Sequence, residues 1–106
     1  MRTLLKVSIP VKSGNKTIKD GTLPKTIQEL SEAIRPEAAY FYAENGKRTA
    51  LFVFDMKDPS QIPAVAEPLF MNLEASVDFW PLMNEADLKA GLEKWAKSNG
   101  KAPVTA

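Results

Sequence analysis

Residues 38–56 read AAYFYAENGKRTALFVFDM, and this stretch decides the fold. Asn45 and Gly46 both tolerate positive φ, as the centre of a type I′ turn requires, so they predict a tight β-hairpin. The aromatic run before them predicts a strand over 38–43, and the run after them predicts another over 48–56. Residues 51–54 are apolar at every position, which is typical of a strand buried on both faces.

One strand and one long helix are expected on the N-terminal side of the hairpin. Apolar residues alternate from Leu5 to Val11, which is strand periodicity, and Pro10 is expected to close that strand. A short helical turn is expected at 15–20. A longer helix is expected to begin at Pro24 and to end before residue 36, because apolar side chains recur there every three or four residues.

A helix, a strand and a second helix are expected on the C-terminal side. Residues 58–61, Asp-Pro-Ser-Gln, predict a capped helix start, and the apolar stripe of that helix extends to residue 73. Residues 76–80 alternate in polarity and predict a fourth strand. A last helix is expected to open at Asn84 and to stop at residues 99–100, Asn-Gly.

This order of elements predicts an α+β domain of the ferredoxin-like kind. The pattern is βαββαβ, which places the four strands in an antiparallel sheet of order 4-1-3-2. Right-handed crossovers put both long helices on one face, and the C-terminal helix is an addition to the pattern. We expect residues 1–100 to form this single domain and residues 101–106 to be a frayed tail.

Composition narrows the function classes. The 106 residues carry a net charge of +1 and contain no cysteine and no histidine. A net charge so close to zero disfavours a nucleic-acid or membrane partner. Without cysteine the chain cannot form disulfides or thiolate metal sites, and without histidine it cannot use imidazole catalysis. We therefore expect no cofactor and no metal. An acidic metal site at Asp55, Asp58 and Glu67 is rejected, since no calcium-loop spacing exists.

The N-terminus carries no signal-peptide pattern, because its apolar run is short and is interrupted by Lys6. No apolar run approaches the ~20 residues that span a bilayer. A cytoplasmic protein is expected. RNA binding is disfavoured as well, since the predicted third strand lacks the glycine and the first aromatic residue of RNA-recognition domains.

The sheet face turned away from the helices is the most informative surface. Strand parity predicts that Leu5, Val7, Ile9, Phe41, Leu51, Val53, Val77 and Phe79 face the helices. The same parity predicts an uncovered face with five aromatic residues, made of Leu4, Lys6, Ser8, Tyr40, Tyr42, Phe52, Phe54, Asp78 and Trp80. So large an apolar surface needs a cover. Either a second copy packs its own sheet there, which we favour, or the last helix folds across it.

Three stretches carry a resemblance to known proteins. Residues 18–28 (IKDGTLPKTIQ), 36–41 (PEAAYF) and 54–63 (FDMKDPSQIP) look like an uncharacterised group of small bacterial proteins. Over residues 3–83 the chain resembles the dimeric α/β-barrel superfamily, in which ferredoxin-like domains pair through their sheets. The resemblance implies a homodimer. That superfamily includes cofactor-free monooxygenases and isomerases, but the catalytic histidine of its better-known branches has no counterpart here.

The candidate site lies on the uncovered face. Lys6 and Asp78 are expected to form an ion pair across adjacent strands, and enclosure would shift their pKa values. The ligand-binding candidates are Lys6, Ser8, Tyr40, Tyr42, Phe52, Phe54, Asp78 and Trp80. We expect a homodimer that binds a small apolar or aromatic ligand there. Two alternatives stay open: a cofactor-independent isomerase or monooxygenase, and a structural or partner-binding module.

Overall fold

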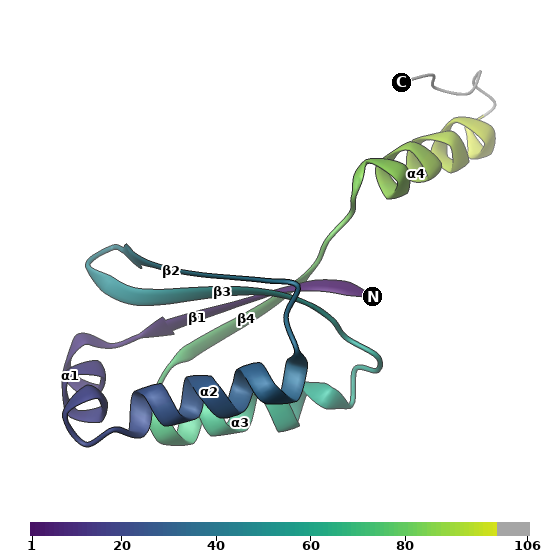
Figure 1. The fold of residues 1–106 in the computed structure, drawn as a ribbon. Coiled ribbons are helices and arrows are strands. Elements are labelled where there is room, and N and C mark those ends of the chain that lie inside the picture. The colour runs from purple at the N-terminus through teal and green to yellow at the C-terminus, as the bar shows by residue number, and fades with distance from the viewer. Residues whose placement is uncertain (100–106) are drawn as a thin grey trace.

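The computed structural model describes residues 1–99. Figure 1 shows a sheet with helices beneath it and one helix that stands apart. The elements are β1 (Arg2–Ile9), α1 (Val11–Lys19), α2 (Thr22–Ile34), β2 (Ala38–Glu44), β3 (Lys47–Asp55), α3 (Gln61–Leu73), β4 (Ser76–Pro81) and α4 (Glu85–Ser98). Gly100 as a helix stop and the frayed tail at 101–106 are predictions that lie outside the described residues.

The four strands form one antiparallel sheet in the order β2-β3-β1-β4. This is the predicted order, 4-1-3-2, written from the other edge. Helices α2 and α3 lie side by side under one face of the sheet (Figure 1). The chain is therefore an α+β domain with an arrangement compatible with the ferredoxin-like fold.

The hairpin forms as its sequence predicts. Asn45 has a φ of 54° and Gly46 a φ of 74°, so both central residues of the turn are in the left-handed region. Glu44 pairs with Lys47 directly across the turn. Because every later pair follows from that first one, the turn fixes which residues of β2 and β3 share a face.

The segment after β1 differs from the prediction. Val11 was expected in the strand and a helical turn only at 15–20, but α1 begins at Val11 and runs to Lys19. Pro10 ends the strand, because it has no N–H for the ladder, and the chain turns directly into the helix. The Ser13 hydroxyl donates to the Leu73 carbonyl at 2.7 Å, which ties α1 to the end of α3.

Asp58 was predicted to cap the helix that follows it, but α3 begins at Gln61 with Ser60 at the N-cap position, and no side chain caps it. Asp58 and Gln61 instead order the turn that precedes the helix. Asp58 Oδ1 accepts from the Ser60 N–H at 2.8 Å, and Gln61 Oε1 accepts from the Asp58 N–H at 3.3 Å. These two bonds satisfy the N–H groups of Asp58 and Ser60 in the turn before α3. They set the entry of α3 beneath the sheet.

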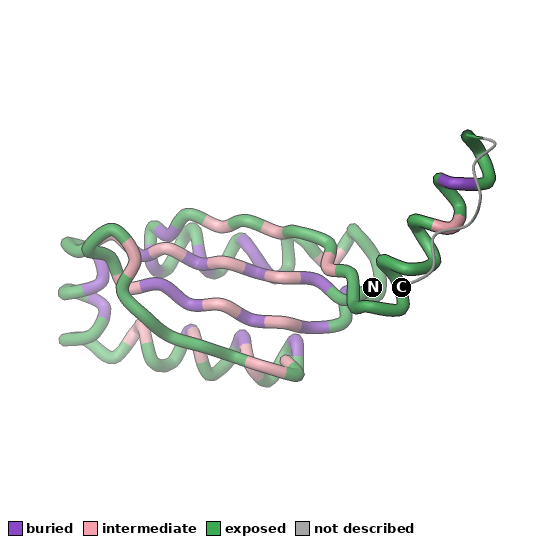
Figure 2. Tube along the Cα trace, turned by 90° about the horizontal axis from the view of Figure 1, so that it is seen from above, coloured by how far each residue is buried: buried purple, intermediate pink, exposed green. Residues whose placement is uncertain are grey.

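The core lies between the sheet and the two long helices. In Figure 2 the two central strands alternate between buried and intermediate positions, as expected for strands with one covered face. Leu5 and Val7 of β1 pack there with Leu30 of α2 and with Leu69 and Leu73 of α3. Among residues 1–99 no helix packs on the opposite face.

Helix α4 stands clear of this body in both views (Figures 1 and 2). Asn84 Oδ1 accepts from the Asp87 N–H at 2.8 Å, and the Asp87 carboxylate accepts from the Asn84 N–H, so the predicted start is confirmed. Within residues 1–99 no helix has both the length and the apolar character to cross a membrane.

Candidate functional site

The open face of the sheet, meaning the face without helices, is built from three rows of paired residues. In the middle row Tyr40, Leu51, Lys6 and Asp78 lie opposite one another across all four strands. The flanking rows are Ala38, Val53, Leu4 and Trp80 on one side, and Tyr42, Thr49, Ser8 and Ser76 on the other. Six of the eight candidate residues, all except Phe52 and Phe54, share this face as predicted.

Phe52 and Phe54 were predicted on the open face, and that prediction is wrong. Phe52 pairs with Leu5 and is 0% exposed beneath the sheet, and Phe54 is 1% exposed. The Phe52 ring meets the Phe41 ring edge-on, with 5.8 Å between centroids and an interplanar angle of 86°. Both phenylalanines are core residues.

Leu51 and Val53, which were predicted to face the helices, occupy the open face instead. The reason is the hairpin register: the pair Glu44–Lys47 puts Tyr40 opposite Leu51. Residues paired directly across a ladder share a face, so the tyrosines lie beside Leu51 and not beside Phe52.

The open face is accessible in the single chain. The Tyr40 side chain is 64% exposed and Trp80 is 44% exposed. Helix α4 does not lie on this face (Figure 1), so the alternative in which the chain covers its own sheet with α4 is wrong. A second copy as the cover stays a prediction.

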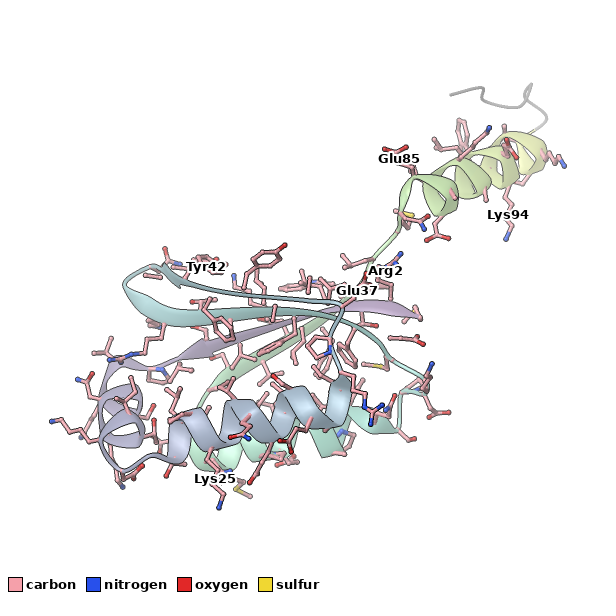
Figure 3. The ribbon with its side chains drawn as sticks, viewed as in Figure 1. Arg2, Lys25, Glu37, Tyr42, Glu85 and Lys94 are labelled. Carbon is pink, nitrogen blue, oxygen red and sulfur yellow. The ribbon has the colours of Figure 1, made fainter. Side chains whose placement is uncertain are left out.

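A polar cluster lies at the end of the open face near the hairpin. The Lys6 ammonium donates to Glu44 Oε2, and the Tyr42 hydroxyl donates to Glu44 Oε1. Figure 3 shows Tyr42 on the side of the sheet away from α2. Lys6 and Asp78 are opposite each other in the ladder, as predicted, but the hydrogen bond and ion pair of Lys6 go to Glu44.

The pKa values of this cluster all move away from neutrality. The hydrogen bond from Lys6, and then the one from Tyr42, lower the pKa of Glu44. The hydrogen bond to Glu44 raises the pKa of Lys6 and that of Tyr42. An acid or base that works near pH 7 needs a pKa near 7. The cluster instead presents a fixed ammonium, carboxylate and phenol, which suits binding better than proton transfer.

We expect Glu44→Gln to lower the stability of the protein only where Glu44 is ionised. The lowered pKa of Glu44 means that its stabilising contribution is present above its ordinary value of 4.5 and is lost as the pH falls through the folded-state pKa. Urea unfolding of both proteins between pH 7 and pH 3 measures this. The difference in unfolding free energy should shrink on acidification. A difference that is constant with pH would contradict the ion pair.

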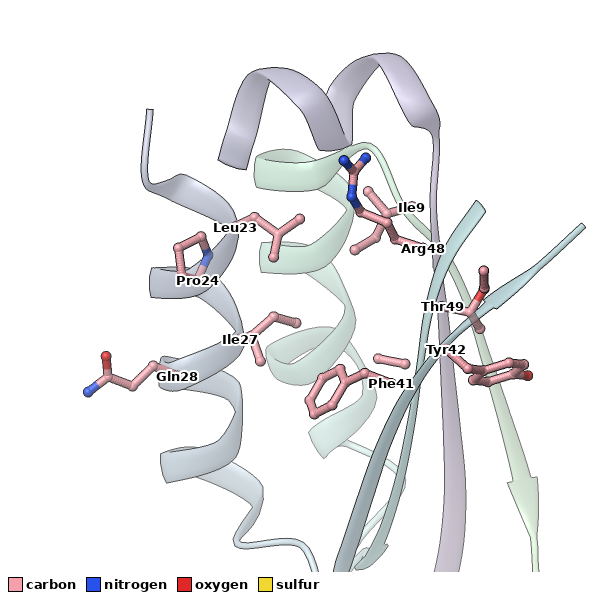
Figure 4. A pocket seen from close by; sticks show the side chains of 11 residues that line it. Ile9, Leu23, Pro24, Ile27, Gln28, Phe41, Tyr42, Arg48 and Thr49 are labelled. Atoms are coloured by element: carbon pink, nitrogen blue, oxygen red, sulfur yellow. The ribbon is translucent and has the colours of Figure 1, made fainter. Parts of the chain in front are cut away.

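A second feature lies on the other side of the sheet, between α2 and the edge strand β2. It is an apolar cleft of about 610 Å³, seen from close by in Figure 4. It is lined by Ile9, Leu23, Pro24, Ile27, Gln28, Phe41, Tyr42, Ala43, Arg48, Thr49 and Ala50. The helices cover the central strands but leave β2 partly bare, and Phe41 is accordingly 62% exposed.

Sequence reasoning missed Glu44 and the whole of this cleft. Glu44 has the same parity as Tyr40 and Tyr42 in β2, so the hairpin register could have placed it beside the tyrosines. The cleft has no comparable signal, because it depends on how far α2 stands from β2.

Comparison with protein-family models gives no match for this chain, and comparison with curated proteins gives none either. Among residues 1–99 no group of three or more acidic side chains is placed to hold a metal ion.

Proposed function

We propose that the chain works as a homodimer whose open sheet faces pack on each other as a ferredoxin-like α/β barrel, and that this barrel binds a small apolar or aromatic ligand. The observation that carries the proposal is the open face itself. It combines exposed rings and aliphatic side chains with an ordered ionic cluster, and no part of the described chain covers it.

The apolar side chains support a second copy as the cover. Tyr40, Tyr42 and Trp80 are exposed large residues, and each ring can bury roughly 150–250 Å². Together with Leu51 they form a surface of the size that marks interaction sites on folded proteins. A copy of the same face is complementary to it, because a two-fold interface brings one patch against itself.

Helix α4 supports the same assembly. It has 14 residues, and isolated helices of this length are marginal in water. Its Leu88 and Leu92 are 48% and 39% exposed, and they lie on one stripe, as residues four apart do. Packing that stripe on a partner would remove it from water, whereas the chain's own sheet lies out of its reach.

The polar cluster supports a ligand rather than a purely structural interface. Lys6 uses one of its three donors on Glu44, and Asp78 lies opposite it in the ladder. Between two packed sheets, groups with unused hydrogen-bonding capacity need a partner. A ligand with an aromatic body and polar substituents would stack on Trp80 or Tyr40 and bond to this cluster.

A thermal-shift screen of small aromatic compounds tests the ligand proposal. A compound at 100 times its dissociation constant adds ~2.7 kcal/mol to the stability of the folded state, which is several degrees for a domain of this size. The stabilisation should decrease in Asp78→Asn and in Glu44→Gln.

Lys25→Gln is the matched control for this screen. Lys25 lies on α2, on the opposite side of the molecule (Figure 3), so its substitution should leave the response unchanged. If no compound stabilises the protein, or if stabilisation persists in both acidic-residue variants, the open face is an interface alone and the structural alternative holds.

A further inference from the structure

The apolar cleft between α2 and β2 contains one charged side chain. Of the eleven described residues that line it, only Arg48 carries a charge. Seven are aliphatic or aromatic residues other than Tyr42, whose ring lies on the open face. The volume of about 610 Å³ is within the range of roughly 300–1,000 Å³ that is usual for small-molecule pockets. Figure 4 shows Arg48 at one end, with its guanidinium group directed toward α1, and Phe41 lower in the cleft.

The Arg48 guanidinium group is held in place by neutral partners. Its Nη2 donates to Asn15 Oδ1 at 3.0 Å. Its Nη1 lies so close to Gly14 of α1 that a Cβ atom there would be 2.6 Å away, so the missing side chain at Gly14 leaves room for the guanidinium group. Among residues 1–99 no carboxylate lies within ion-pair distance of Arg48.

Arg48 is partly buried as a residue, and its guanidinium group bonds to Asn15 at the surface. A guanidinium group without a carboxylate partner can bind an anion. A guanidinium group presents five N–H donors in a planar fork that matches a carboxylate. One of these donors is used on Asn15. The rest of the cleft offers apolar contact, so its natural complement is a molecule with one charged end.

We propose that this cleft binds a monocarboxylic acid with an apolar body, with the carboxylate on Arg48 and the apolar part along Leu23, Ile27 and Phe41. The cleft has one cationic side chain, which matches the single negative charge of a carboxylate better than the two charges of a phosphate dianion. The cleft is on the helix side of the sheet, so it stays open in the proposed dimer. The inference therefore goes beyond the proposed function and does not depend on it.

Isothermal titration calorimetry with decanoate and with decan-1-ol tests this proposal. The two probes share the apolar chain and differ in the charged end. Decanoate should bind more tightly than decan-1-ol, and Arg48→Gln should weaken decanoate by ~10–100-fold, the usual range for a lost charge-assisted hydrogen bond. Binding of decan-1-ol should hardly change.

A second variant keeps the test valid if Arg48→Gln folds poorly. Asn15→Asp leaves Arg48 in place but gives it a carboxylate partner at the position of the present Asn15 amide oxygen, so decanoate affinity should fall in the same direction. Lys47→Gln is the matched control. It removes one positive charge from the neighbouring residue of β3, on the other face of the sheet, and should leave the affinity unchanged.

Two further variants test whether decanoate binds in the cleft between α2 and β2. Ile27→Trp fills the cleft and should abolish binding of both probes, whereas Leu51→Asp on the open face should leave both affinities unchanged. The proposal is overturned if decanoate does not bind, or if it binds no more tightly than decan-1-ol. It is also overturned if Leu51→Asp removes binding while Ile27→Trp does not, or if decanoate affinity falls as dimer forms, since a helix of a second copy would then occupy the cleft.

Discussion

Leu51→Asp is expected to convert the protein from a dimer to a monomer. Leu51 is half-buried at the centre of the open face, between Lys6 and Tyr40 in the middle row of paired residues. In the proposed dimer two new carboxylates would lie near the two-fold axis without water, which costs several kcal/mol. Light scattering should give about twice the 11.7 kDa of one chain for the wild type and about the mass of one chain for the variant.

The control for this experiment is a charge-reversing substitution on the helical side of the molecule. Lys25→Glu should remain dimeric, because Lys25 lies on α2 away from the open face (Figure 3). Circular dichroism should show that Leu51→Asp is folded, since an aspartate on an exposed sheet face leaves the core intact. A wild-type protein that runs as a monomer at high micromolar concentration would contradict the dimer.

Phe52→Ala is expected to lower the stability of the protein far more than any substitution at its surface. The Phe52 side chain is fully buried and packs edge-on against Phe41. Truncation of a buried phenylalanine to alanine costs about 3–5 kcal/mol, and the total stability of a domain is only about 5–15 kcal/mol. Urea unfolding should show a marked drop in the midpoint concentration.

Urea unfolding at several protein concentrations also shows whether Phe52 belongs to the core or to the dimer interface. Stability of a dimer depends on protomer concentration, so a core substitution should lower stability equally at all concentrations and keep the dimer. Lys25→Ala should change stability by less than ~0.5 kcal/mol. A loss below about 1 kcal/mol for Phe52→Ala, or a loss of dimer, would place the ring on the open face after all.

The strand order, the hairpin turn and the start of α4 could be predicted from the sequence because local chemistry determines them. Asn45 and Gly46 specify one turn geometry, and the capping residue Asn84 accepts from the N–H three positions after it. The order of elements then leaves few sheet topologies. The extent of α1 was missed because Val11 continues the alternation of Leu5, Val7 and Ile9 and was therefore assigned to the strand, although it is the first residue of the helix.

The prediction of which β3 side chains face the helices was wrong because the odd-numbered and the even-numbered residues of this strand are both apolar. Residues 51–54 give no periodicity to choose a face from, and the bulk of Phe52 and Phe54 suggested an aromatic surface. The hairpin turn contained the missing information. Once Glu44 pairs with Lys47, Tyr40 must pair with Leu51, and the same step brings Glu44 itself to the open face near Lys6.

The cleft could not be predicted from the sequence for a different reason. Ile27, Phe41 and Arg48 are far apart in the chain, and each has an ordinary local role on a helix or strand. They meet only because α2 covers the middle of the sheet and leaves its edge. Such a gap depends on the distance between two layers, which no residue pattern specifies.

The two edges of the sheet differ in how well they resist unwanted strand addition. The outer strand β4 is six residues long and ends at Pro81, which has no N–H to offer an incoming chain. The other outer strand, β2, has seven residues, contains no proline and carries exposed rings. Edges of that kind template the pairing of extended peptides. Self-assembly of misfolded material is therefore expected to begin at β2, and a single lysine or proline there would serve as a gatekeeper.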